Sequence, residues 1–279
     1  MTDARAAATA ALTAIGQLAD AEVDIGNAAL QFARVDAPDA DWQAAARHLS
    51  ELAQAVVKRA VAMDTEDLPG RAAALAEVLA GEFGYAGDMD TYDDPANANL
   101  IKVIERRRGL PVALGVIWLH AARAAGWDSH GVDFPAHFLV ALEGRKTQVV
   151  VDVFNGGQLM TARELRVLLK RVEGEDAELR PGLLQPMSTR RVLLRLQNNI
   201  MTRRLDAGDL RGGLRCMEDM LLVAPDQAEL WRQAGAMNQK LEQVAAARDC
   251  YQRFLALVPE GRIANGVRAQ LDILKSMLN

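Results

Sequence analysis

The chain has 279 residues, half of them hydrophobic and a quarter charged, a balance typical of a globular protein with a buried core. Its formal net charge of -5 argues against a general nucleic-acid binder, because phosphate contacts need clustered Lys and Arg. No apolar stretch approaches the roughly 18 residues of a membrane helix, and charges at Asp3 and Arg5 make the alanine-rich start a poor signal peptide.

Two cysteines occur, Cys216 and Cys250. They lie 34 residues apart, at equivalent positions of a repeat described below, so no disulfide framework is implied. We therefore expect a reducing, cytoplasmic location, with no membrane and no nucleic acid as partner.

Residues 4–84 have apolar positions at helical spacing and are predicted to be helical throughout. Asp39 or Asp41 is a suitable cap for the second helix. Leu68-Pro69-Gly70 is predicted to break the pattern, and a further helix is expected from Arg71 to about Phe83.

The middle of the chain begins with a turn-rich loop over residues 85–98, rich in Gly, Asp, Pro and Asn. A helix is predicted from Asn99 to Arg108. After Gly109-Leu110-Pro111, a strongly apolar helix is predicted from Val112 to Ala125.

The period then changes to that of strands. Strand-like sequences cover 131–134, 137–142 and 148–154, and Asn155-Gly156-Gly157 is expected to end the sheet. Thr161, with Glu164 three residues later, predicts a capping box at the start of the next helix.

The C-terminal third repeats itself. After a boundary marked by Pro181, Gly182 and Pro186, positions such as Pro225 and Pro259 recur 34 residues apart, which is the length of a tetratricopeptide (TPR) unit. The repeats span about 194–227 and 228–261, with a capping helix over 262–278. An unrelated pair of helical hairpins remains an alternative.

Three elements in the middle of the chain stand in a suggestive order. A helix begins just after Pro111, one strand carries His137 and a second strand carries Asp152. This is the layout of papain-like and transglutaminase-like triads, in which a thiol at a helix start has a lowered pKa. The histidine exchanges its proton and the carboxylate orients the imidazole.

Several motifs make the resemblance specific: Tyr85-Ala86-Gly87-Asp88, Asp94-Pro95-Ala96-Asn97-Ala98-Asn99-Leu100, Arg106-Arg107-Arg108-Gly109-Leu110-Pro111, Gly131-Val132-Asp133-Phe134-Pro135-Ala136-His137-Phe138 and Asp152-Val153-Phe154-Asn155-Gly156-Gly157. In this order they resemble the transglutaminase-like core of the bacterial SirB-type family, whose members also carry C-terminal TPRs. The resemblance implies a mostly helical α+β fold. An N-terminal helical part, 1–84, would pack as one unit with a transglutaminase/papain-like core with a small antiparallel sheet, 85–186. TPR-like α-hairpins would follow over 187–279.

The resemblance assigns His137 as the triad histidine, Asp152 as its carboxylate, and a position near Ala113 as that of the nucleophile. No residue from Leu110 to Gly115 has a nucleophilic side chain, and no cysteine precedes Cys216. Ala98 and Ala136 also depart from the family's serine and glycine. We therefore expect the thiol mechanism to be absent.

Four further residues are candidates for binding around the cleft: Asn97, Arg107, Trp118 and His130. Each has a structural alternative, since Asn97 could pin the long loop, Trp118 could be core, and Arg106 to Arg108 could be either an anion site or a solvated helix end. His120, His130, Asp133 and His137 match no compact metal motif, and neither a metal nor another cofactor is expected.

Two functions remain open. In the first, the protein is a non-catalytic interaction protein that holds a protein or peptide partner of unknown identity in the remnant cleft, with the TPRs as a second contact. In the second, His137 and Asp152 activate water for amide or ester hydrolysis, with oxyanion donors near Val112 to Leu114. Without a nucleophile, the same pair could instead simply hold two strands together.

Overall fold

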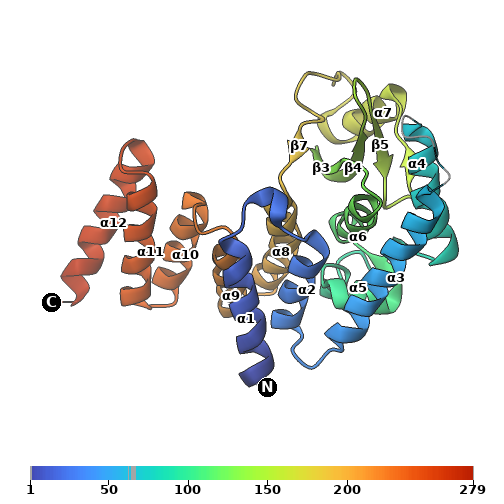
Figure 1. The fold of residues 1–279 in the computed structure, drawn as a ribbon. Coiled ribbons are helices and arrows are strands. Elements are labelled where there is room, and N and C mark those ends of the chain that lie inside the picture. The colour runs from blue at the N-terminus through green and yellow to red at the C-terminus, as the bar shows by residue number, and fades with distance from the viewer. Residues whose placement is uncertain (1, 62, 64–66, 279) are drawn as a thin grey trace. The chain divides into compact units, whose positions relative to one another are not determined.

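The structure, a computed structural model, describes residues 2–61, 63 and 67–278. The described chain forms two compact units. The first contains residues 2–8 and Ala19–Leu196, and the second contains Thr9–Leu18 and residues 197–278. Both units are largely helical, and the strands lie in the first (Figure 1).

Most helices of the first unit begin at a side chain that caps the first turn. The helices are α2 (Ile25–Asp36), α3 (Trp42–Ala60), α4 (Leu68–Leu75), α5 (Leu100–Arg106), α6 (Pro111–Ala124) and α7 (Ala162–Glu173). Among them, α6 begins with Pro111 and has no side-chain cap. Side chains of Asp24, Asp41, Asp67 and Asn99 accept hydrogen bonds from first-turn N–H groups, which stabilises helix starts. The predicted capping box at Thr161 is confirmed.

The predicted break at Leu68-Pro69-Gly70 is wrong. Asp67 caps the Gly70 N–H, and these three residues form the first turn of α4. Proline fits there because its missing N–H has no intrahelical partner in the first turn. The helix then continues as a π-helical segment, η2 (Ala76–Glu82).

Five strands form an antiparallel sheet in the order β6-β5-β4-β3-β7. They are β3 (Ser129–Phe134), β4 (His137–Glu143), β5 (Gln148–Asp152), β6 (Gln158–Leu159) and β7 (Pro186–Met187). The three central strands match the predicted ones. The expectation that Asn155-Gly156-Gly157 ends the sheet is wrong, because the chain turns there and returns as β6 beside β5.

The sheet is packed between two helices (Figure 1). A Cβ at Gly115 of α6 would lie 2.1 Å from the Phe138 ring, so α6 packs closely on the face that carries Phe138. On the other face, Leu165 and Leu169 of α7 pack with Leu139, Ala141 and their neighbours. Because side chains alternate along a strand, His137 falls on the α7 face.

Three short elements complete this unit. Two are the 3-10 turns η1 (Asp20–Glu22) and η3 (Pro95–Asn97). The third is a parallel pair of two-residue strands, β1 (Ala86–Gly87) and β2 (Arg108–Gly109), which fixes the start of the long loop against the end of α5. The sequence did not predict this pair.

The second unit is built from helices: the later part of α1 (Thr2–Gly16), the later part of α8 (Thr189–Asp206), α9 (Leu210–Val223), α10 (Ala228–Lys240), α11 (Val244–Leu257) and α12 (Arg262–Leu278). A Cβ at Gly235 would lie 2.5 Å from the Tyr251 ring, so α10 and α11 pack closely at this glycine. Residues of α12, including Ala264 and Leu271, pack on Tyr251 and Phe254.

Candidate functional site

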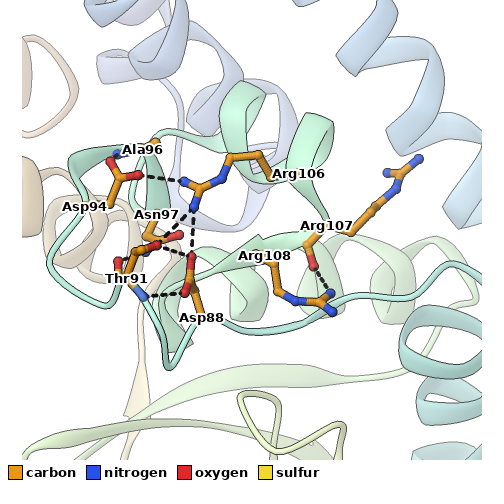
Figure 2. A network of polar contacts seen from close by, with 8 residues as sticks. All are labelled: Asp88, Thr91, Asp94, Ala96, Asn97, Arg106, Arg107 and Arg108. Atoms are coloured by element: carbon orange, nitrogen blue, oxygen red, sulfur yellow. Dashed lines mark hydrogen bonds and ion pairs between the residues drawn. The ribbon is translucent and has the colours of Figure 1, made fainter.

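The long loop before α5 is held by a compact polar network, which we call the loop cluster: Asp88, Thr91, Asp94, Asn97 and Arg106 (Figure 2). Arg106 donates to Asp88 at 2.8 Å and to Asp94 at 3.2 Å. Thr91 donates to Asp88 through its backbone and its hydroxyl, and these bonds hold the pKa of Asp88 below its ordinary value. The Asn97 amide donates to the Thr91 carbonyl at 2.6 Å.

The other two arginines of the Arg106–Arg108 run are also engaged within the protein. Arg107 ends α5 with a φ of 57°, donates to the Tyr85 hydroxyl at 2.5 Å and contacts His48. Arg108 donates to the carbonyls of Gly84 and Arg107. All three guanidinium groups therefore bind protein groups.

Trp118 and His130 are buried in different parts of the first unit, and neither lines the His137 pocket described below. Trp118 is fully buried in α6, against Gly157. His130 is buried on β3 with its Nδ1 3.6 Å from Glu143, and burial lowers the pKa of its imidazole. A binding role for Asn97, Arg107, Trp118 and His130 stays a prediction.

The structure brings His137 and Asp152 together. His137 Nε2 lies 3.0 Å from Asp152 Oδ1, although the contact is off the line of a ring N–H hydrogen bond. The Phe154 ring lies edge-on to the imidazole at a centroid distance of 6.5 Å. Since Nε2 faces the carboxylate, Nδ1 is the ring nitrogen left to exchange a proton with a bound molecule.

Asp152 is held firmly at the end of β5. Its Oδ1 accepts from the backbone N–H groups of Phe154 and Asn155, and its Oδ2 accepts from the Asn155 amide at 2.8 Å. Burial acts to raise the pKa of Asp152, but the interactions with His137 and Asn155 outweigh it and keep that pKa below its ordinary value. The carboxylate is thus ionised and fixed in position.

His137 and Asp152 open on a pocket of about 560 Å³. It is lined by Met89, His137, Asp152, Phe154, Asn155, Gln158, Met160, Arg163, Glu164, Val167, Leu168 and Arg171. Five of these residues belong to α7. Only 16% of the His137 side chain is exposed, so the imidazole forms part of the pocket wall.

The predicted nucleophile position has a different environment. Ala113 lies in the first turn of α6 and is fully buried. Among the described residues that line the pocket, none comes from α6. The histidine pocket is therefore walled by α7, and the start of α6 contributes no group to it.

Sequence comparison agrees with this architecture. The profile of the transglutaminase-like superfamily matches residues 43–198, more than half of the chain. The chain belongs to the transglutaminase-like superfamily. A tetratricopeptide repeat profile matches residues 203–272, so this transglutaminase-like protein carries TPRs at its C-terminal end, as the sequence predicted.

The sequences of two relatives match this transglutaminase-like protein over nearly their whole length. A UPF0162 protein of Xylella fastidiosa is 33% identical over 257 residues, covering 90% of each chain. Protein SirB1 of Salmonella typhimurium is 24% identical, over 88% of this chain and 90% of its own. These relatives identify it as a SirB-type member. A solved structure of menin aligns with a TM-score of 0.41 at 9% identity, over 88% of this chain and 69% of its own.

The sequence did not single out the α7 residues of the pocket. Arg163, Val167 and Arg171 recur four residues apart, which places them along one side of a helix. The signal in the sequence that could have identified this helix side as a binding surface is an apolar residue, Val167, between two cationic ones. In the described part of the chain, no helix has the length and hydropathy to cross a membrane.

Proposed function

We propose that this protein is a non-catalytic interaction protein whose transglutaminase-like unit holds a segment of another protein in the His137 pocket. The observation that carries the proposal is Ala113, a buried residue without a nucleophilic group at the start of α6. Covalent acyl transfer needs an activated nucleophile within reach of its base. The TPR helices, a type of repeat that usually contacts proteins, would supply a second contact.

The pocket itself supports a binding role. It combines apolar side chains such as Phe154, Met160 and Leu168 with a few fixed polar groups, the usual make-up of binding sites. Asp152 and Asn155 bond to each other, which keeps this wall in one arrangement without a ligand.

One observation favours a second function, hydrolysis of amide or ester bonds. Nε2 of His137 faces Asp152, and this leaves Nδ1 to act as a general base toward water. Against it, no described residue of the α6 start lines the pocket, so the oxyanion donors expected near Val112 to Leu114 do not face it.

The test uses the full-length protein with a photo-crosslinking amino acid at Val167, on the pocket wall. The matched control carries it at Val57, exposed on α3 away from the pocket. We expect a defined protein segment, identified by mass spectrometry, to be crosslinked from Val167 and not from Val57. Turnover of amide or ester substrates that is lost in His137→Ala would overturn the proposal in favour of hydrolysis, and the absence of any crosslink specific to Val167 would refute the binding role.

A further inference from the structure

The mouth of the His137 pocket exposes apolar side chains. Met89 is 76% exposed and Val167 is 53% exposed, and both line the pocket. Leu159 on the adjoining β6 is also exposed. Exposed apolar side chains that gather at the mouth of a pocket are typical of a surface that contacts a ligand or another protein.

The carboxylates of the pocket are already engaged. Asp152 accepts from Phe154 and Asn155. Glu164 accepts from the Thr161 backbone N–H in the capping box, and the bonds with Thr161 hold the pKa of Glu164 below its ordinary value. These negative charges are therefore directed at groups of the protein itself.

The two arginines of the pocket differ from their neighbours. Arg166 on the same helix pairs with Glu178, and Arg180 nearby pairs with Glu173. Within the described residues, neither Arg163 nor Arg171 forms a salt bridge, although the charge of Arg163 acts on the neighbouring Glu164. Two guanidinium groups without a salt bridge, beside carboxylates that are internally bonded, favour an anionic occupant.

The spacing of these groups fits an extended chain. Arg163 and Arg171 are eight residues apart on α7, which is about 12 Å along a helix, with Val167 midway. In an extended peptide, residues 1, 3 and 5 point to one side and span about 13 Å. The pocket also includes Gln158 of β6, the edge strand of the sheet, and exposed edges accept extended segments.

From this match we infer that the pocket receives an extended segment of a partner protein in which an apolar residue stands between two acidic ones, in the pattern acidic–any–apolar–any–acidic. The acidic side chains pair with Arg163 and Arg171, and the apolar side chain packs between Val167 and the pocket floor. This inference rests on the proposed function, because it names the chemistry of the segment held beside His137.

The experiment measures fluorescence anisotropy of three labelled peptides with the full-length protein. Their cores are Glu-Ala-Leu-Ala-Glu, Gln-Ala-Leu-Ala-Gln and Lys-Ala-Leu-Ala-Lys, in the same Gly-Ser flanks. We expect the Glu peptide to bind about tenfold more tightly than the Gln peptide, since two partly exposed ion pairs of about 0.7 kcal/mol each amount to a factor of ten. The Lys peptide should bind more weakly still.

Charge reversal of the protein provides the matched control. Arg163→Glu with Arg171→Glu should reverse the preference from the Glu peptide to the Lys peptide. Lys146→Glu makes the same type of change in the exposed β4–β5 turn, at the opposite end of β4 from His137, and should leave the preference unchanged. Reversal of preference also shows that the double variant is folded. Equal binding of the three peptides, or an unchanged preference in the double variant, would overturn the inference.

The two proposals fail in different ways. If Val167 crosslinks a defined segment that has no acidic residues, the acidic class is wrong and the binding function stands. If Val167 gives no specific crosslink and no peptide binds, the binding function fails as well.

Discussion

Two polar clusters of the transglutaminase-like unit, the loop cluster and the His137 pocket, differ in how their arginines are paired. In the loop cluster, Arg106 at the end of α5 is bonded to Asp88 and Asp94 on the loop that precedes this helix (Figure 2). In the pocket, Arg163 and Arg171 form no such salt bridge with any residue that the structure describes. The comparison teaches that a conspicuous charged motif can serve folding alone, while inconspicuous arginines on an amphipathic helix are left available to a ligand.

The largest effect should follow from opening the loop cluster. Arg106→Ala leaves the buried Asp88 carboxylate without its cation, and we expect it to lower the free energy of unfolding by about 2–3 kcal/mol. Urea unfolding followed by tryptophan fluorescence in a Trp231→Phe background reports the first unit, since Trp42, Trp118 and Trp127 all belong to it. Arg108→Ala, which removes bonds to two backbone carbonyls only, should cost less than about 1 kcal/mol. Equal losses of unfolding free energy in Arg106→Ala and Arg108→Ala would show that the ion pairs of Arg106 have no special weight in stability.

A smaller loss is expected at the fixed side of the pocket. Asp152→Asn replaces a carboxylate oxygen that accepts from Asn155 with a group that cannot accept equally well, and should cost about 1–2 kcal/mol of unfolding free energy. The same fluorescence assay measures it. Asn155→Ala is the companion variant, and a cost near zero in both would show that the pocket wall does not depend on these bonds.

The pH dependence of stability should carry the signature of Asp152. Its pKa in the folded protein lies below the ordinary value of 3.8, so its charge stabilises the fold above that value. This contribution is lost as the pH falls through the lower folded pKa. Urea midpoints between pH 5 and pH 2 should therefore fall more steeply for the wild type than for Asp152→Asn, and parallel curves would contradict the assigned shift.

The smallest effect on folding should come from the arginines of the pocket. Arg171→Ala removes no salt bridge among the described residues, and its unfolding free energy should stay within about 0.5 kcal/mol of the wild type. Affinity for the Glu-Ala-Leu-Ala-Glu peptide should nevertheless fall about threefold, for one ion pair of about 0.7 kcal/mol. A stability loss as large as that of Arg106→Ala would show that Arg171 stabilises the fold and is not available to a ligand.

Most of the fold follows from sequence periodicity. The apolar helix α6, the three central strands and the 34-residue repeat have the regular spacing that packing requires. The errors fall where local signals have two meanings. Leu68-Pro69-Gly70 reads as a break, but proline in a first helical turn is favourable. Asn155-Gly156-Gly157 reads as an end, but the same residues form a tight return to β6.

The site was predictable only in part. Ordered motifs identified His137 and Asp152, which the structure places 3.0 Å apart. Arg163 and Arg171 could not be identified, because their availability depends on which carboxylates the fold brings near them. Arg166 is equally cationic in the sequence, yet Glu178 lies beside it after folding.

The turn between β3 and β4 places Pro135 and Ala136 between the paired residues Phe134 and His137. Ala136 has a φ of 53°, in the left-handed region of the backbone. Glycine adopts this conformation readily, whereas for alanine it costs roughly 1 kcal/mol of conformational free energy. A glycine at this position would relieve part of this strain and so raise the free energy of unfolding. An Ala136→Gly background would then have greater mutational tolerance, so that pocket substitutions too damaging for the parent chain could be studied in folded protein.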